Sequence, residues 1–272
     1  MTDAAPDSAA SRSVVIVPTF NEIENLAAIV DAVFTAAPQV DVLVVDDDSP
    51  DGTGQLADRI AATDDRVAVL HRTERAGLGQ AYLAGFARTL AEGYDIVIEM
   101  DADGSHPASA LPAMIDRLTG DPALGTVIGS RWIRGGRVVD WPARRRWLSE
   151  GANAYARIML GIPVRDSTAG FRAFRAEALR GIHLETVASH GYCFQIDMTR
   201  RVADAGFGIA EVPITFRDRV HGTSKMSGAI VGEAMLRVTG WGIQRLFRPR
   251  GRAGRTTRSL SDSSNGADHP AG

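Results

Sequence analysis

Short apolar segments that are each followed at once by polar residues constrain the fold of this chain most strongly. The segments 14–17, 42–45 and 96–100 precede the sequences PTFNE, DDDSPDGT and DADGSHP. Stretches with the helical spacing of apolar residues, such as 24–37 and 78–91, separate these segments. Strands that alternate with helices form right-handed crossovers and a mostly parallel sheet. The expected fold class is therefore α/β, a single domain whose mostly parallel central sheet is flanked by helices.

The polar sequences predict one shared site, because ligands of such sheets bind at the carboxyl ends of the strands. Within DADGSHP, Asp101 and Asp103 can share one face of an extended chain. Two carboxylates that close repel each other unless a cation or a proton lies between them. The residues alone leave three interpretations open: a divalent-metal site, an aspartyl nucleophile pair of the phosphatase kind, or a solvated turn.

The metal interpretation explains most of the pattern. Mg²⁺ and Mn²⁺ prefer carboxylate oxygens and keep coordination places for phosphate oxygens. Such an ion can neutralise a diphosphate as it leaves. The phosphatase interpretation is the main rival, although such enzymes usually carry the pair on the first strand and here it follows a later one. A dinucleotide fingerprint at Gly77–Gly79 is disfavoured, because Tyr82 stands where the third glycine is needed.

Composition narrows the class and the compartment. The chain has 272 residues and a net charge of −3, and no apolar run approaches a membrane span. Its polar start has no signal-peptide core, and the single Cys193 fits a reducing compartment. Residues 248–272 hold five Arg against two Asp, so the residues before them sum to −6 and do not predict a nucleic-acid binder.

The expected organisation has four parts. Residues 1–12 are expected to be disordered, 13–227 to form the catalytic domain, 228–247 an amphipathic helix, and 248–272 a disordered Arg-rich tail. In the second half the apolar spacing predicts helices over 108–118, 148–160 and 194–205, and strands over 126–130, 171–174 and 209–216.

Nine segments together resemble the family-2 glycosyltransferases, and within them the polyprenol-phosphate (dolichol-phosphate) mannose synthases. They cover roughly residues 14–226 and read VPTFNEIENL, VVDDDSPDGT, GLGQAYLAGF, MDADGSHP, GSRW, LSEGAN, DSTAGFRAFR, GYCFQIDM and EVPITFRDRVHGTSKMS. The resemblance implies a GT-A fold, Mg²⁺ or Mn²⁺, and inverting transfer of mannose from GDP-mannose to a polyprenyl monophosphate. The chain departs from the family at Phe20, where Tyr is usual, and at Ser105, where some relatives carry Gln.

The resemblance also implies site residues. The donor would be bound by Pro18, Phe20, Glu22, Val45, Asp47, Asp101, Ala102, Asp103, Arg219 and Lys225, and the metal by Asp101, Asp103 and Ser105. The acceptor phosphate would contact Arg131, Arg145 and Ser149, and the catalytic residues would be Asp101, Asp103, Arg131 and Lys225. Lys225 is the sole lysine among 30 basic residues, and there it would neutralise the diphosphate in a closed site. His106 and His221 are expected to be structural.

A lipid acceptor implies contact with a membrane. The expected location is cytoplasmic, peripheral on the inner face of the membrane, with a separate membrane-anchoring protein as a further expectation. Residues 229–247 would lie in the interface, with the basic tail attracted to anionic lipid, or would pack on the core. The alternatives kept are another donor such as UDP-glucose, a phospho-aspartate phosphatase, and an inactive subunit that binds nucleotide beside a membrane partner.

Overall fold

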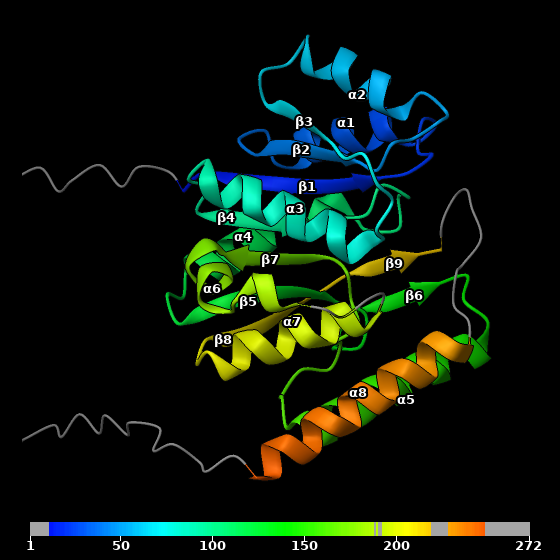
Figure 1. The fold of residues 1–272 in the computed structure, drawn as a ribbon, viewed down its shortest axis with the longest axis vertical. Coiled ribbons are helices and arrows are strands. Elements are labelled where there is room, and N and C mark those ends of the chain that lie inside the picture. Colours follow the sequence, from blue (N-terminus) through cyan, green and yellow to red (C-terminus); the bar gives the residue numbers. More distant parts are fainter. Residues whose placement is uncertain (1–10, 188, 190–191, 219–227, 248–272) are drawn as a thin grey trace, which may run out of the picture.

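A seven-stranded sheet runs through the centre of the computed structural model, which describes residues 11–187, 189, 192–218 and 228–247 (Figure 1). Its strand order is β3-β2-β1-β4-β7-β5-β8, and β6 pairs with β9 in a small second sheet. The strands are β1 Ser13–Thr19, β2 Asp41–Asp46, β3 Val67–His71, β4 Ile96–Glu99, β5 Leu124–Ser130, β6 Arg137–Val139, β7 Arg172–Arg175, β8 Gly208–Pro213 and β9 Thr215–Arg217. The predicted α/β class with a mostly parallel sheet is confirmed.

The central strands are apolar because both faces of the sheet are covered. Every residue of β1 and β4 is buried, as expected for parallel strands between two helical layers. The exception to the parallel arrangement is β7, which lies antiparallel between β4 and β5. Its register sets Arg172 beside Glu99 of β4, which brings two charged residues into the centre of the sheet.

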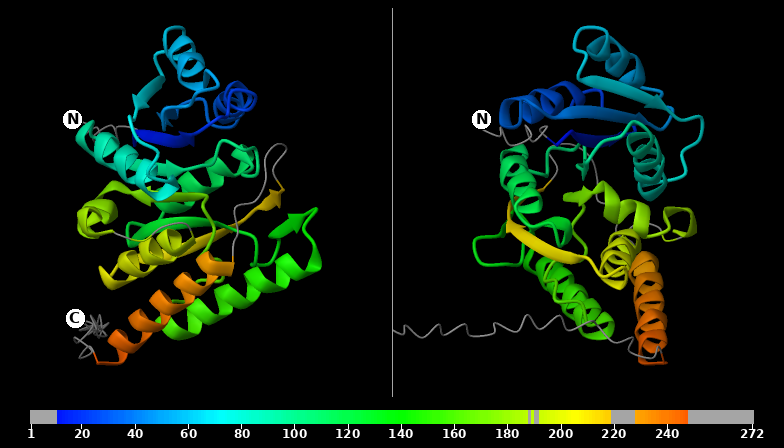
Figure 2. Two further views of the ribbon diagram at one scale, coloured as in Figure 1. Left: turned by 45° about the vertical axis from the view of Figure 1, so that its right-hand side comes forward. Right: turned by 90° about the vertical axis from the view of Figure 1, so that its left-hand side faces the viewer.

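Helices cover the two faces separately (Figure 2). They are α1 Leu26–Ala36, α2 Thr53–Ala61, α3 Leu78–Ala91, α4 Leu111–Thr119, α5 Ala143–Leu160, α6 Ala176–Gly181, α7 Tyr192–Asp204 and α8 Gly228–Phe247, with 3₁₀ turns at Ala108–Ala110 and Leu184–Thr186. Val15 and Val17 pack against α1 and α4, whereas Val14 and Ile16 pack against α3 and α7. This alternation along β1 divides the core between the two faces.

Several elements differ from the sequence prediction. Helix α5 begins at Ala143, five residues before the predicted start at 148. The prediction missed these residues because the first turn is polar and has no apolar spacing. A salt bridge between Arg146 and Glu150, one turn apart, supports the helix there. The predicted strand 209–216 divides at Ile214 into β8 and β9. Strand β6 and helix α6 were not expected, since both are short and have no clear period.

Helix α8 lies along α5 and contacts α7 at the side of the domain (Figures 1 and 2). Val238 is buried in this contact, and the hydroxyls of Tyr155 and Thr239 are 2.6 Å apart. Within the described ranges, no helix combines the length and the apolar character that crossing a membrane requires. Residues 1–10, 219–227 and 248–272 fall outside the described residues, so the predicted domain boundaries stay predictions.

Candidate active site

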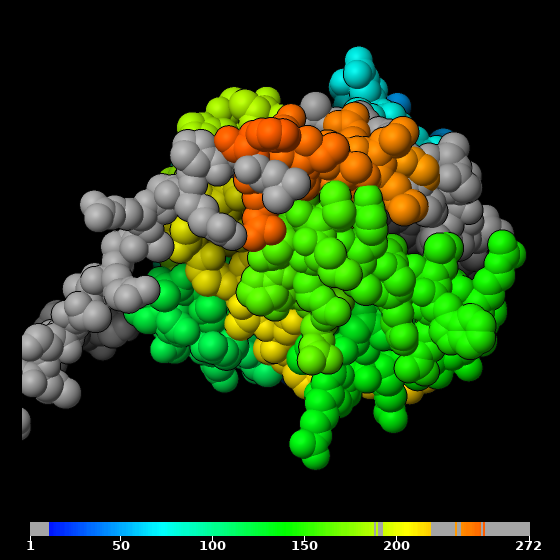
Figure 3. Space-filling model, turned by 90° about the horizontal axis from the view of Figure 1, so that it is seen from below, coloured from blue at the N-terminus to red at the C-terminus, as the bar shows by residue number. Residues whose placement is uncertain are grey.

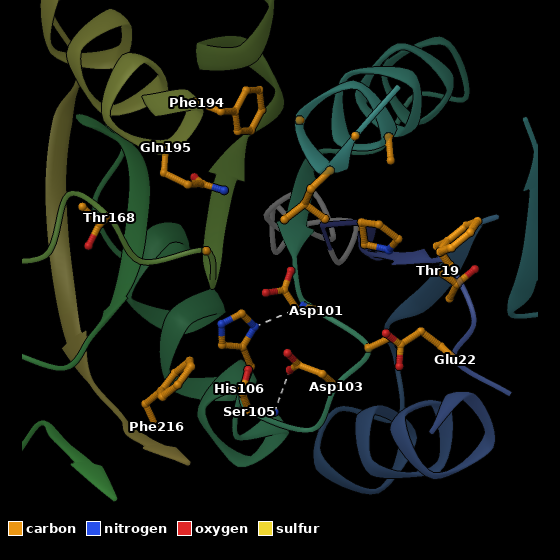
Figure 4. A pocket seen from close by; sticks show the side chains of 18 of the residues that line it. Thr19, Glu22, Asp101, Asp103, Ser105, His106, Thr168, Phe194, Gln195 and Phe216 are labelled. Atoms are coloured by element: carbon orange, nitrogen blue, oxygen red, sulfur yellow. Dashed lines mark hydrogen bonds between the residues drawn. The ribbon is translucent and has the colours of Figure 1, made fainter. Parts of the chain in front are cut away.

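The three polar sequences that follow β1, β2 and β4 meet in one pocket of about 480 Å³. Pro18, Glu22, Asp47, Asp101 and Asp103 all line it, as do the predicted residues Phe20, Ala102, Ser105, Arg131 and Arg145. Figure 4 shows the carboxylates of Asp101 and Asp103 turned into the same space. The pocket therefore has a carboxylate-rich centre, with aromatic and basic side chains to each side.

The loop after β4 fixes both of its aspartates. The Asp101 backbone N–H donates to His106 Nδ1 (3.1 Å), and the Tyr82 hydroxyl donates to Asp101 Oδ1 (2.9 Å). The Ser105 N–H donates to Asp103 Oδ1 (3.0 Å). Burial raises the pKa of Tyr82 well above its usual value, and the nearby carboxylates raise it further. The phenol therefore stays protonated and remains a hydrogen-bond donor to Asp101.

The oxygen atoms of this loop suit a hard divalent cation. Among the described residues no group of three or more His, Cys, Asp or Glu is arranged to hold a metal ion. The protein ligands of a metal ion would be the carboxylates of Asp101 and Asp103. The Ser105 hydroxyl could be a third ligand, because it is buried without a hydrogen-bond partner. Such an incomplete set of oxygen ligands fits Mg²⁺ or Mn²⁺, which take their remaining ligands from substrate phosphates and water.

One side of the pocket carries the predicted donor residues. The Phe20 ring lies under the guanidinium of Arg75, with 3.7 Å between Arg75 Cζ and the ring centroid. Asp47 accepts a hydrogen bond from Arg72 Nη1 (2.6 Å). Burial raises the pKa of Asp47, an effect that Arg72 opposes. The Val45 side chain is fully buried in the hydrophobic core and does not line the pocket, and its contact with the donor stays a prediction.

The other side carries the predicted acceptor residues. Arg131 is held by buried Asp166, with Nε to Oδ2 at 2.8 Å and Nη2 to Oδ1 at 2.6 Å. Arg145 Nη1 donates to Asp218 Oδ2 (2.8 Å). Ser149 lies one turn further along α5 and does not line the pocket. Arg219, His221 and Lys225 lie outside the described residues.

Several residues that line the pocket or hold its side chains escaped the sequence reasoning. Arg75 lines the pocket and Arg72 binds Asp47, and both follow β3, where the sequence HRTER gives only a basic loop. Asp166 lies within DSTAGFRAFR, which carried part of the family resemblance but no assigned role. Phe216 ends the predicted strand 209–216, and Trp141 stands alone between Asp140 and Pro142, so neither was assigned to the site. Their positions depend on the fold bringing distant segments together, and local sequence patterns carry no signal for this.

Two buried titratable residues, Glu99 and Arg172, are neighbours on adjacent strands beneath the pocket. Glu99 and Arg172 are both fully buried, and Gln195 Nε2 donates to Glu99 Oε2 (2.9 Å). Arg172 donates to Thr199 Oγ1 and to the Ser167 carbonyl oxygen, each at 2.7 Å. Burial raises the pKa of Glu99 to about 8 even though Arg172 and the Gln195 hydrogen bond oppose the shift. The folded protein therefore holds a proton on Glu99 at a pH at which an exposed glutamate has lost it.

This shift predicts a pH-dependent stability. Because its pKa is higher in the folded state, Glu99 contributes most to the free energy of unfolding below its ordinary pKa of 4.5. This contribution to stability is lost as the pH rises toward 8. The difference in melting temperature between wild type and Glu99→Gln should therefore change in this interval. From pH 5 to pH 8 the wild-type value should fall by at least about 3 °C more than the value of the variant. Differential scanning fluorimetry with chelator present measures this, and Glu185→Gln, at an exposed position, is the control. Parallel curves for wild type and Glu99→Gln would contradict the assignment.

The loop that follows β4 and carries Asp101 and Asp103 is called the carboxylate loop. The fold and this loop are those of a nucleotide-sugar-dependent transferase. The family model described as Glycosyl transferase family 2 matches residues 14–182, and the chain belongs to that family. The chain is 53% identical over 251 residues to a polyprenol monophosphomannose synthase of Mycolicibacterium smegmatis, covering 92% of this chain and 94% of that protein. It is also 53% identical to an undecaprenyl-phosphate mannosyltransferase of Micrococcus luteus, over 85% of this chain and 94% of the relative.

Solved structures share the fold at lower identity. Glucosyl-3-phosphoglycerate synthase from Mycobacterium tuberculosis, in complex with Mn²⁺, UDP and phosphoglyceric acid, aligns with a TM-score of 0.60 and 21% identity over 89% of this chain and 80% of that one. A mannosyltransferase from Pyrobaculum calidifontis, in complex with GDP-Man and Mn²⁺, aligns with a TM-score of 0.56 and 21% identity, over 91% and 67%. At these identities the likeness supports the GT-A fold alone.

Proposed function

We propose that this chain transfers mannose from GDP-mannose to a polyprenyl monophosphate and forms polyprenyl phosphate β-mannose. The observation that carries the proposal is the 53% identity, over nearly the full length of both chains, to a polyprenol monophosphomannose synthase. The pocket supports it, because a carboxylate loop suited to a metal-bound diphosphate lies between Phe20 and Asp47 on one side and Arg131 and Arg145 on the other. Family membership removes the phosphatase alternative.

The chemistry is a single displacement. An oxygen of the acceptor phosphate forms a bond to the anomeric carbon of mannose, while the bond from that carbon to the diphosphate breaks and GDP leaves with the electron pair. The attacking oxygen is already anionic, so no protein group has to remove a proton. One displacement inverts the anomeric centre, which makes the product a β-linked mannosyl phosphate.

The residues of the pocket would divide the work between the two substrates. Asp101 and Asp103 would hold Mg²⁺ or Mn²⁺, which when bound supplies positive charge to the departing diphosphate. Tyr82 and His106 keep Asp101 in place through the hydrogen bonds described above. Arg145 and Arg131 would hold the acceptor phosphate, and the orientation they impose supplies much of the rate. Lys225 and Arg219 would neutralise the donor diphosphate, and this role stays a prediction.

The decisive experiment is transfer of radiolabelled mannose from GDP-mannose to a polyprenyl phosphate. The product should be a lipid that is stable to mild alkali and labile to mild acid, and chelator should abolish its formation. UDP-glucose is the competing donor, and thermal shifts with GDP and UDP in the presence of Mn²⁺ compare the two nucleotides directly. Transfer from UDP-glucose alone would replace the proposed donor. Binding of donor without any transfer would favour the inactive-subunit alternative.

A peripheral location at the membrane fits an apolar surface on α5 and α8, which lie side by side in Figure 3. Large apolar side chains with nearly half or more of their surface exposed are Trp147, Leu148 and Ile158 on α5 and Met235, Leu236, Ile243 and Phe247 on α8. The sequence left two alternatives for residues 229–247, a helix at the membrane interface and a helix packed on the core. In the structure one side of α8 packs on the domain and another side remains exposed. We propose that this surface rests on the membrane that contains the acceptor. A tethering protein stays a prediction.

The membrane surface predicts that an added charge weakens lipid binding. In co-sedimentation with vesicles of phosphatidylglycerol and phosphatidylcholine, Leu236→Glu combined with Ile158→Glu should leave most of the protein in the supernatant. The exposed fraction is 77% for Leu236 and 74% for Ile158, so the substitutions cost little folding stability. Ile23→Glu, at an exposed apolar position before α1, is the control. Equal pelleting of all three proteins would exclude this surface as the contact.

A further inference from the structure

Trp141 lies between the two arginines at the acceptor side of the pocket. The guanidinium of Arg145 is over its ring, with Cζ 4.0 Å from the centroid, and Arg131 Cζ is 5.5 Å from the same ring. Trp141 itself lines the pocket. A cation within about 6 Å of an indole face is attracted by the ring quadrupole. One aromatic side chain therefore contacts both cations that the acceptor phosphate would meet.

The two arginines are held in different ways. Arg131 is bound by the buried Asp166 carboxylate through a fork of two hydrogen bonds, reinforced by the bond from its own N–H to Asp166 (2.8 Å). Arg145 donates one hydrogen bond, from Nη1, to the partly exposed carboxylate of Asp218, and its buried Nε has no hydrogen-bond partner. The carboxylate at Arg145 is therefore in a position to exchange with another anion, whereas the carboxylate at Arg131 is fixed.

An aromatic partner is suited to an arginine that must bind phosphate. A carboxylate orients a guanidinium but cancels its charge and repels an incoming anion. The face of an indole ring orients the guanidinium and leaves its positive charge in place. When a phosphate oxygen takes the place of Asp218 at Arg145, the contact with Trp141 persists and keeps the guanidinium from turning away.

Other rings hold Trp141 in place. Phe216 meets it edge to face, with centroids 5.5 Å apart and an interplanar angle of 77°, and Trp132 meets it at 6.3 Å and 64°. Phe216 also contacts His106 at 5.7 Å, and Figure 4 shows His106 between Asp101 and Phe216. The ring of Trp141 is therefore supported, through Phe216 and His106, by the loop that follows β4.

We propose that Trp141 is a positioning residue for the acceptor phosphate, and that its ring face holds the Arg145 guanidinium in the orientation that binds this group. The inference rests on the proposed function, because it takes Arg145 as part of the acceptor site. It predicts an effect on the acceptor alone. The donor residues Phe20 and Asp47 contact Arg75 and Arg72 instead, on the other side of the pocket.

The test measures binding and kinetics separately. Titration calorimetry with a short, water-soluble prenyl monophosphate gives the dissociation constant, and mannose transfer gives KM for each substrate. Trp141→Leu should weaken prenyl phosphate binding by about tenfold and raise the acceptor KM similarly, with the donor KM within about twofold of wild type. Trp141→Phe keeps a ring face and should restore most of the affinity.

Trp241→Leu is the matched control, since Trp241 also lies under an arginine, with 4.9 Å from Arg200 Cζ to its ring, but does not line the pocket. Melting temperatures establish that each variant is folded. Wild-type acceptor affinity in folded Trp141→Leu, or an equal rise in both KM values, would overturn the inference. Wild-type protein that binds prenyl phosphate but transfers no mannose would instead overturn the proposed function.

Discussion

Replacing Asp103 by Asn should lower mannose transfer by about a thousandfold, the scale at which removal of one electrostatic contact to the transition state acts. The amide oxygen of Asn can still accept the Ser105 N–H, which now donates to Asp103 Oδ1 at 3.0 Å. The loop should therefore keep its shape. The lost property is the negative charge that would bind the divalent ion, so binding of donor in the presence of metal should weaken together with turnover.

A second aspartate provides the control for this loop. Asp121 Oδ1 accepts the N–H of Ala123 at 3.2 Å, the same two-residue spacing, and Asp121 does not line the pocket. Asp121→Asn should leave transfer within about twofold of wild type. The stabilisation by Mn²⁺ with GDP, read as a thermal shift, should disappear in Asp103→Asn alone. Persistence of that shift and of turnover in Asp103→Asn would remove Asp103 from the metal site.

Replacing Arg145 by Gln should raise the acceptor KM by about a hundredfold, because a hydrogen bond to a charged group is lost together with its Coulomb attraction. The donor KM should change little, since the donor residues lie on the other side of the pocket. The natural control is Arg146→Gln on the same helix, where Arg146 pairs with Glu150 at 2.7 Å and does not line the pocket. A water-soluble acceptor keeps membrane binding out of the comparison.

Arg145 is a sharper test of the acceptor site than Arg131. The Asp218 side chain is 37% exposed, so water can solvate its carboxylate when Arg145 is removed. Removing Arg131 would strand Asp166, which is fully buried, and loss of such a partner costs about 3–5 kcal/mol. Loss of activity in an Arg131 variant would therefore mix unfolding with lost binding. An Arg145→Gln protein with wild-type acceptor KM would contradict the assigned role.

The sequence was most informative where one short stretch carries the whole signal. The helix predicted over 78–91 is α3, Leu78–Ala91, and the strands before the polar clusters lie where apolar runs predict them. The convergence of those clusters followed from a general property of parallel sheets, without any knowledge of loop geometry. Asp101 and Asp103 could therefore be placed in a pocket on the strength of their neighbours alone.

Long-range pairing could not be predicted in this way. The apolar run at 171–174 predicts a strand but does not give its direction, so the antiparallel β7 and its pairing of Arg172 with Glu99 were missed. Arg131 and Asp166 are 35 residues apart, and each alone looks like a surface charge. The resemblance assigned Val45 to donor binding, whereas the structure shows that its side chain packs in the core beneath the strand end, and no local pattern indicates this.

The order of the predicted substrate-binding residues along the chain has a consequence for how substrate preference can change. Every predicted donor residue within the described ranges lies between Pro18 and Asp103, and every predicted acceptor residue lies between Arg131 and Ser149, beyond the crossover helix α4. Apart from Arg219 and Lys225, the predicted assignments thus place the two substrate preferences in successive, non-overlapping parts of the chain. A chimera that joins the first 110 or so residues of one relative to the remainder of another would keep the nucleotide-sugar preference of the first and acquire the lipid preference of the second.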